Sequence, residues 1–230
     1  MKIKTLLANF VSLLYPDLCV ICGEPLVENE KFFCFACYLK LPKTNCHLFT
    51  ENQAIERLAG KVSLEKASSY LYYNKGGIAQ KLIAEIKYKG NRNLGKWIGG
   101  YLAKDMISSG FFQGIDYVVP VPLHRSKEKK RGFNQAEKIA EGISHVTKIP
   151  METTNVFREK ANTSQTKKGV FDRWKNARNL FQLKNPELYN EKHILLIDDV
   201  LTTGSTLEAV AQSLLKSQGV KVSILTLAIT

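Results

Sequence analysis

The sequence predicts an α/β fold with a mostly parallel sheet flanked by helices, preceded by a small cysteine-rich unit. Two observations support this prediction. Apolar, strand-like runs alternate with segments of helical period, and four cysteines form two C-x-x-C pairs near the N-terminus. At 230 residues, the chain suits one medium domain with a small appendage. We expect an amphipathic helix over residues 1–16, a zinc ribbon over 17–45, a connection with a leading strand over 46–75 and the main domain over 76–230.

The first residues imitate a short signal peptide, because Lys2 and Lys4 precede an apolar stretch. However, no small-residue cleavage site follows, and the apolar residues from Ile3 to Leu14 have helical spacing. We therefore expect a packed helix rather than a signal peptide. The longest apolar runs are far shorter than the ~20 residues of a membrane span, so we expect a cytosolic protein.

Four cysteines, Cys19, Cys22, Cys34 and Cys37, have the spacing of a zinc ribbon. Four thiolates close a tetrahedral site with no open position for water, which predicts a structural zinc ion rather than a catalytic one. A unit of some thirty residues cannot build an adequate core alone, so the metal would supply much of its folding free energy. Disulfides are the alternative, and they suit a cytosolic chain poorly. The adjacent Cys46 and His47 are expected to be bystanders rather than an alternative pair of ligands.

The formal net charge of +12 is unevenly distributed. One basic run lies between Arg125 and Arg131, and another lies between Lys160 and Arg178. Such charge attracts polyanions, of which nucleic acid is the commonest in cells. A solvated basic face without a partner is equally compatible with charge alone. The candidate DNA-binding residues are Lys127, Lys129, Lys130, Lys167, Lys168 and Arg173.

In the middle of the chain, the residue pattern predicts a strand over 66–74 and helices over 76–90 and 97–110. Gly90 to Lys96 reads G-x-x-x-x-G-K, as a nucleotide-binding P-loop does. We reject a P-loop there, because Trp97 replaces the Ser or Thr that binds magnesium and a helix is predicted before it.

A second strand is predicted over 117–121, followed by a loop that carries Arg125 and Arg131 and by a helix over 132–145. Guanidinium groups bind phosphate oxygens in a bidentate manner, so this loop is a candidate pyrophosphate site. Residues 158–169 are polar and aperiodic, which predicts a mobile loop able to close over a ligand.

The stretch ILLIDDVLTTGST, residues 194–206, predicts a buried strand, a loop and the start of a helix. Loop amides and the N-terminus of a helix together favour an anion such as phosphate. Asp198 and Asp199 would repel a bare phosphate, so the ligand should also offer hydroxyl groups or a metal ion. A phosphorylated sugar meets both requirements. The alternative is a crossover connection whose aspartates only cap a helix.

This stretch resembles the 13-residue phosphoribosyl pyrophosphate (PRPP) signature of type I phosphoribosyltransferases. The chain as a whole resembles the ComF family, a bacterial group related to the late competence protein ComFC. Three features carry this resemblance: the four-cysteine ribbon, RGFNQAEKIA at Arg131 to Ala140, and a following polar loop. That loop carries Arg158, Thr163, Ser164, Gln165, Arg173 and Asn176. The chain has one set of four cysteines, whereas some relatives carry more.

The resemblance implies a type I phosphoribosyltransferase-like domain whose acidic pair, Asp198 and Asp199, faces the ribose hydroxyls and is catalytic in an enzyme. Arg125 and Arg131 would hold the pyrophosphate, with magnesium bridging ribose and pyrophosphate. The turn would wrap the 5'-phosphate with Thr202, Thr203, Gly204, Ser205 and Thr206.

The resemblance also implies a role in DNA uptake during natural transformation, beside a ComFA-like helicase and recombination mediators. Basic residues could follow the backbone of single-stranded DNA, while Tyr88, Trp97 and Phe133 are candidates for stacking on bases. The alternative is a PRPP-dependent phosphoribosyltransferase that acts on an unknown small-molecule acceptor. Fold alone does not decide between them.

Overall fold

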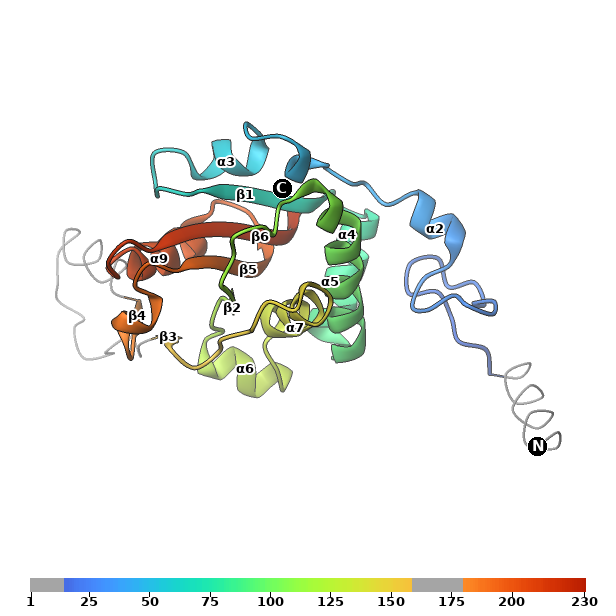
Figure 1. The fold of residues 1–230 in the computed structure, drawn as a ribbon. Coiled ribbons are helices and arrows are strands. Elements are labelled where there is room, and N and C mark those ends of the chain that lie inside the picture. Colours follow the sequence, from blue (N-terminus) through green and yellow to red (C-terminus); the bar gives the residue numbers. More distant parts are fainter. Residues whose placement is uncertain (1–14, 159–179) are drawn as a thin grey trace.

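The computed structural model describes residues 15–158 and 180–230 (Figure 1). Its centre is a four-stranded sheet in the order β1-β6-β5-β2, in which neighbouring strands run parallel. The predicted α/β architecture with a parallel sheet is therefore confirmed. The strands are β1 (Lys66–Tyr72), β2 (Tyr117–Pro120), β5 (His193–Leu201) and β6 (Lys221–Ile229).

Each strand of the sheet contributes to two hydrophobic cores, because successive side chains point to opposite faces. In β5, Leu195 and Ile197 belong to one core, whereas Ile194 and Leu196 belong to the other. The first core is completed by helices α4 (Ile78–Tyr88), α5 (Arg92–Met106) and α7 (Gln135–Thr147), and the second by α3 (Gln53–Leu58) and α9 (Ser205–Leu214). The sheet is thus covered on both faces, as its apolar strands require (Figure 1).

Helices α5 and α7 pack so closely that two of their glycines have no room for a side chain. A Cβ at Gly99 would lie 2.1 Å from the carbonyl oxygen of Ile139, and one at Gly142 would lie 2.0 Å from that of Lys96. Backbone oxygens cannot move aside as a flexible side chain can. The two helices therefore form one closely packed layer on this face of the sheet.

The predicted loop with Arg125 and Arg131 is wrong, because residues Arg125–Arg131 form helix α6. The side chain of His124 caps its first turn by accepting from the Ser126 N–H, and Gly132 ends it with φ of +77°. Lysines and arginines favour helix, and their charge is stabilised near the C-terminal end of the helix dipole. The predicted helix over 132–145 consequently starts later, at Gln135, where the side chain of Asn134 caps α7.

Residues 46–75, predicted as a connection with a strand, also contain helical turns. Cys46–Leu48 is a 3-10 turn, and α3 follows after Asn52, whose side chain accepts hydrogen bonds from two backbone N–H groups. Buried Ala54 and Leu58 attach α3 to the second core. Further along the chain, Gly90 follows helix α4 rather than a strand, in agreement with the rejection of a P-loop.

The remaining elements within residues 15–158 and 180–230 are short. They are α2 (Phe35–Leu39), two 3-10 turns (Ile107–Ser109 and Pro186–Tyr189) and an antiparallel pair, β3 (Val156–Arg158) with β4 (Phe181–Leu183). Among the described residues, no helix is long and apolar enough to cross a membrane. All but the last two residues of the helix predicted over 1–16 lie outside the described residues, as does the loop predicted over 158–169 apart from Arg158.

Candidate functional site

The strand, turn and helix predicted around the acidic pair are present as β5, residues 202–204 and α9. Gly204 is buried and adopts φ of +80°, where a side chain would also press against Leu58 of α3. Around it, Thr202, Thr203, Ser205 and Thr206 are exposed. The backbone N–H groups that begin α9 therefore lie beside exposed hydroxyl groups, an arrangement that suits a phosphate.

Asp198 and Asp199 lie near the carboxyl end of β5, where ligands of parallel sheets bind. Both are partly buried. The Oδ2 atom of Asp199 lies 2.8 Å from Nζ of Lys87, near the end of α4. The Asp199 N–H donates to Oδ1 of Asp198 at 2.8 Å. The acidic pair is thus held by a lysine from a separate helix, which the sequence analysis did not identify.

Burial raises the pKa of Asp198 to about 7, and the negative charge of Asp199 acts in the same direction. The Asp199 N–H and the Lys87 ammonium act in the opposite direction and do not outweigh these causes. Near neutral pH, the charge of the acidic pair therefore depends on pH and on Lys87.

The phosphate turn is supported from α3, which the sequence analysis also missed. Arg57 donates to the carbonyl oxygens of Thr202 at 2.8 Å and Thr230 at 2.6 Å. Lys61, just after α3, donates to the carbonyl oxygen of Thr203 at 2.7 Å. A helix of six residues is too short to show a clear period, so these contacts had no signal in the sequence.

Arg131, predicted to bind pyrophosphate, is connected to the acidic pair through one side chain. It donates to Oε1 of Gln135 at 2.8 Å, and Gln135 lines the same small void as Lys87 and Asp199. Its guanidinium also lies 5.8 Å from the ring centroid of Tyr88. Arg125, the other candidate, begins α6. Arg131 thus lies at the end of a helix instead of in a loop, and it contacts a residue that lines the void beside Asp199.

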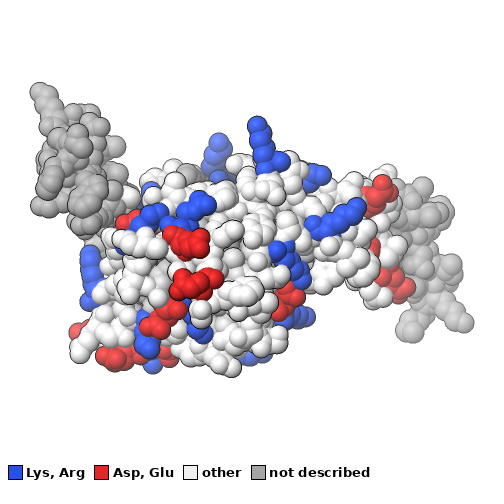
Figure 2. Space-filling model, turned by 90° about the horizontal axis from the view of Figure 1, so that it is seen from above, with Lys and Arg blue, Asp and Glu red and all other residues white. Residues whose placement is uncertain are grey.

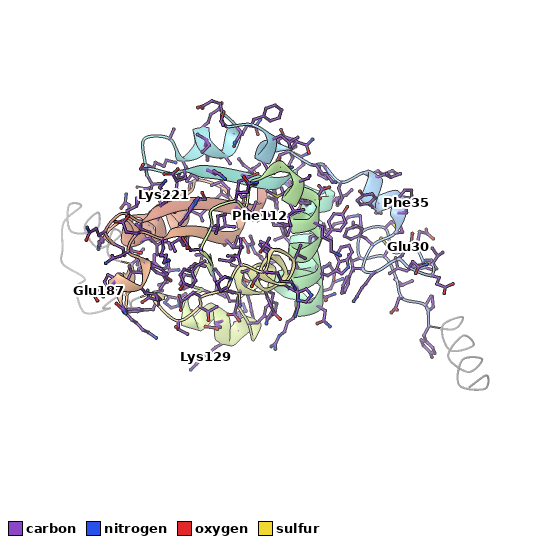
Figure 3. All side chains as sticks on the ribbon, viewed as in Figure 1. Glu30, Phe35, Phe112, Lys129, Glu187 and Lys221 are labelled. Carbon is purple, nitrogen blue, oxygen red and sulfur yellow. The ribbon has the colours of Figure 1, made fainter. Side chains whose placement is uncertain are left out.

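Among the basic DNA-binding candidates, Lys127, Lys129 and Lys130 lie on α6. The side chain of Lys129 points away from the body of the protein (Figure 3). Lys167, Lys168 and Arg173 lie outside the described residues. Seen from above, Lys and Arg alternate with Asp and Glu, so the positive charge forms no continuous patch on this face (Figure 2).

The three aromatic candidates have different environments. Phe133 is 6% exposed and lies under the Arg92 guanidinium, so it is not available to stack on a base. Tyr88 is 77% exposed. Trp97, on α5, is partly buried against the ribbon, where its ring packs edge-on against Phe33.

The four predicted metal ligands, Cys19, Cys22, Cys34 and Cys37, converge on one point. Their sulfur atoms all lie within 4.8 Å of one another, and those of Cys22 and Cys34 are 3.7 Å apart. A tetrahedral zinc ion with four thiolates places its sulfurs ~3.8 Å apart, so the cluster fits such an ion. The structure shows every cysteine as a free thiol, which does not support the disulfide alternative.

The electrostatics of the cluster also suit a cation. Burial acts to raise the pKa of Cys19, but hydrogen bonds from backbone N–H groups, including those of Cys22 and Cys34, lower it to about 6. Burial and the neighbouring thiols raise the pKa of Cys37. Four thiolates therefore require a positive ion among them. Cys46 is buried outside this cluster.

Comparisons with known proteins identify the family of the chain. Residues 100–229 match the family described as phosphoribosyl transferase domain. The DNA utilization protein YhgH of Escherichia coli (strain K12) is 25% identical over 224 residues, which cover 91% of this chain and 95% of the relative.

Two competence proteins are also similar to the chain. Competence protein ComFC of Bacillus subtilis (strain 168) is 28% identical over 221 residues, which cover 88% of this chain and 86% of the relative. Competence protein F of Haemophilus influenzae (strain ATCC 51907 / DSM 11121 / KW20 / Rd) is 36% identical over 107 residues, which cover 45% of each chain. The chain therefore belongs to the phosphoribosyl transferase domain family and is a ComFC-like protein with an N-terminal four-cysteine cluster.

Proposed function

We propose that this protein is an accessory of DNA uptake in natural transformation, which binds single-stranded DNA and carries a ribose-phosphate site of the PRPP type. One observation carries the ribose-phosphate site: an acidic pair and an exposed hydroxyl turn meet at the end of β5. The role in DNA uptake is supported by the names of the relatives, which are DNA utilization and competence proteins. A cytosolic location and contact with a ComFA-like helicase and a recombination mediator belong to the same proposal.

In this site, Asp198 and Asp199 accept hydrogen bonds from the ribose hydroxyls. Carboxylate oxygens are also the ligands that Mg²⁺ prefers, so the pair fits an ion shared with PRPP. The 5'-phosphate binds at the start of α9, where the helix dipole and the backbone N–H groups of the first turn favour an anion. Its hydroxyl donors are Thr202, Thr203, Ser205 and Thr206, arranged around Gly204.

Arg131, with Arg125 at the other end of α6, is proposed to bind the pyrophosphate. An arginine presents paired N–H donors that match phosphate oxygens. The hydrogen bond from Arg131 to Gln135, a residue that lines the same void as Asp199, supports this role.

The cysteine cluster is proposed to hold one structural zinc ion. All four positions of a tetrahedral ion would be filled by thiolates, so the ion would stabilise the ribbon and leave no position for a substrate. The ribbon packs on the main domain, since Cys19, Phe33 and Cys37 belong to the same core as α4 and α5. Loss of the ion should therefore also affect that core.

The second candidate is transfer of the phosphoribosyl group of PRPP to a small-molecule acceptor. The proximity of Asp198 and Asp199 to the phosphate turn favours it, because these groups could bind the ribose and its phosphate. During such a transfer, the bond between C1' and the pyrophosphate oxygen breaks as the acceptor bonds to C1'. Arg131 would stabilise the charge that develops on the departing pyrophosphate.

Two titrations of the full chain test the proposal. A fluorescent oligo(dT) is titrated at about 50 and about 200 mM salt, because phosphate contacts make log affinity fall with log salt by ~0.7 per contact. PRPP with magnesium is titrated by calorimetry. Salt-sensitive oligonucleotide binding together with PRPP binding is the expected result. A flat salt plot would remove the DNA role, and absence of PRPP binding would remove the ribose-phosphate site.

A further inference from the structure

A groove of about 820 Å³ lies between the cysteine ribbon and the outer side of α5 and α7. Its volume is within the ~300–1,000 Å³ typical of ligand sites. None of its lining residues lines the void beside Asp199 or belongs to the phosphate turn. The groove is therefore a second candidate site, separate from the ribose-phosphate site.

Three aromatic rings line the groove. Trp97 and Tyr101 of α5 are stacked, with centroids 5.3 Å apart and planes 18° apart. Phe32 of the ribbon lies 5.6 Å from Trp97, tilted by 60°. All three rings are partly buried, so each is fixed by packing and still reaches the surface. Such rings are the usual platform for unpaired bases.

The charge of the groove is positive. Its lining includes four lysines, Lys31, Lys96, Lys104 and Lys148. It includes no acidic residue among those that the structure describes. Lys96 is neutralised by Glu141, 2.6 Å away. Within the described ranges, Lys31, Lys104 and Lys148 are exposed and have no ion pair, so their charges remain available to an anion.

We propose that this groove binds single-stranded nucleic acid, an assignment that rests on the proposed DNA-binding function. Bases stack against the ring cluster of Phe32, Trp97 and Tyr101, and phosphates contact the three lysines that have no ion pair among the described residues. Rings at the wall favour a single strand over a duplex, whose bases are already stacked on one another. The lysines and the absence of acidic lining residues favour a polyanion over a protein partner.

The first test compares three double variants of the full chain for their affinity for fluorescent oligo(dT). Lys104→Gln with Lys148→Gln removes two groove charges. Lys184→Gln with Lys216→Gln removes the same charge from exposed residues that do not line the groove. Lys129→Gln with Lys130→Gln removes two positive charges from α6.

At about 0.1 M salt, each lost phosphate contact lowers single-strand affinity by about fivefold, so the groove variant should lose about 25-fold and its salt slope should fall by about 1.4. The Lys184 and Lys216 variant should stay within about twofold of the unmodified chain. The α6 variant measures the contribution of the DNA-binding candidates Lys129 and Lys130, and thermal unfolding checks that all three variants fold.

The second test observes the aromatic wall directly. The chain has two tryptophans, so Trp174→Phe leaves Trp97 as the only one. Stacking of bases on Trp97 should quench its fluorescence when oligo(dT) binds, whereas an abasic oligomer with the same phosphates should bind more weakly without quenching.

The outcomes separate the two proposals. If only the α6 variant loses affinity, or if Trp97 shows no response, the groove assignment is overturned while DNA binding stands. If the unmodified chain has no salt-sensitive affinity for oligo(dT), the proposed DNA function fails, and the groove assignment fails with it.

Discussion

Lys87 and Asp199 form an ion pair beside the carboxyl end of β5, with 2.8 Å between Nζ and Oδ2. The pair joins α4 to the strand that carries both aspartates. It also affects the charge of Asp198, because Lys87 acts to lower the pKa of that carboxyl group against the larger effect of burial.

Replacing both aspartates, Asp198→Asn with Asp199→Asn, should abolish binding of PRPP with magnesium. Asparagine keeps the shape of each side chain but removes the negative oxygens that accept from ribose hydroxyls and bind the ion. Calorimetry measures the loss, and circular dichroism checks the fold. Asp17→Asn, at an exposed position of the ribbon, is the matched control. Unchanged affinity in the double variant would remove the site assignment.

Affinity for PRPP with magnesium should fall as the pH decreases through about 7. The pKa of Asp198 is raised to about 7, so below that pH its carboxyl group is protonated and neutral. Lys87→Gln removes a cation that lowers this pKa, so the midpoint should move to higher pH. Calorimetric titrations on both sides of neutrality measure the shift.

The control for this comparison is Lys89→Gln, which changes an exposed lysine paired with Glu85. The midpoint of its pH dependence should equal that of the unmodified chain. Titration of PRPP itself contributes equally to both. An identical midpoint in the Lys87 variant would show that this lysine does not set the charge of Asp198.

Metal analysis should find one zinc ion per chain, and Cys34→Ser should lose it. Three remaining thiolates leave the ion incompletely bound, and the ribbon depends on it for folding. Cys46→Ala is the control, because Cys46 is buried outside the cluster. A stable protein without metal would contradict the zinc ribbon.

Arg57→Ala should weaken binding of ribose 5-phosphate by about fivefold. Its guanidinium donates to Thr202 and Thr230, and loss of such a hydrogen bond costs about 1 kcal/mol. The turn should then lose its fixed geometry. Glu56→Ala changes the neighbouring exposed residue and should have little effect. Equal affinities for the two variants would mean that α3 does not position the turn.

Gly142→Ala should destabilise the protein by about 3 kcal/mol or more, because the new methyl group meets backbone atoms of α5 that cannot move aside. Gly100→Ala is the matched control, since its Cβ would lie 3.4 Å from Val146, at ordinary contact distance. Alanine favours helix over glycine by ~1 kcal/mol, so this variant should be neutral or more stable. Urea unfolding compares the two, and equal stabilities would contradict the close packing of α5 and α7.

The features that could be predicted from the sequence are those in which neighbouring residues carry the whole signal. The parallel sheet is visible in its apolar strands, and the cysteine cluster is visible in its two C-x-x-C pairs. The turn around Gly204 is likewise contiguous with the aspartates and with α9. In each case the spacing along the chain determines the local geometry.

The features that were missed depend on contacts between distant segments. Lys87 reaches Asp199 from α4. Arg57 and Lys61 reach the turn from a segment more than 140 residues earlier in the sequence. The basic run at Arg125–Arg131 was predicted as a loop because its polar residues show no apolar period, although most of them favour helix. The groove is also non-local, since Phe32 meets Trp97 only after folding.

Binding of oligo(dT) at low and moderate salt, with and without saturating PRPP and magnesium, tests the central claim most directly. The account predicts oligonucleotide binding that weakens steeply with salt and persists when PRPP is bound, because the groove and the acidic pair share no lining residue. PRPP binding without any affinity for the oligonucleotide would contradict the DNA function and favour a small-molecule phosphoribosyltransferase.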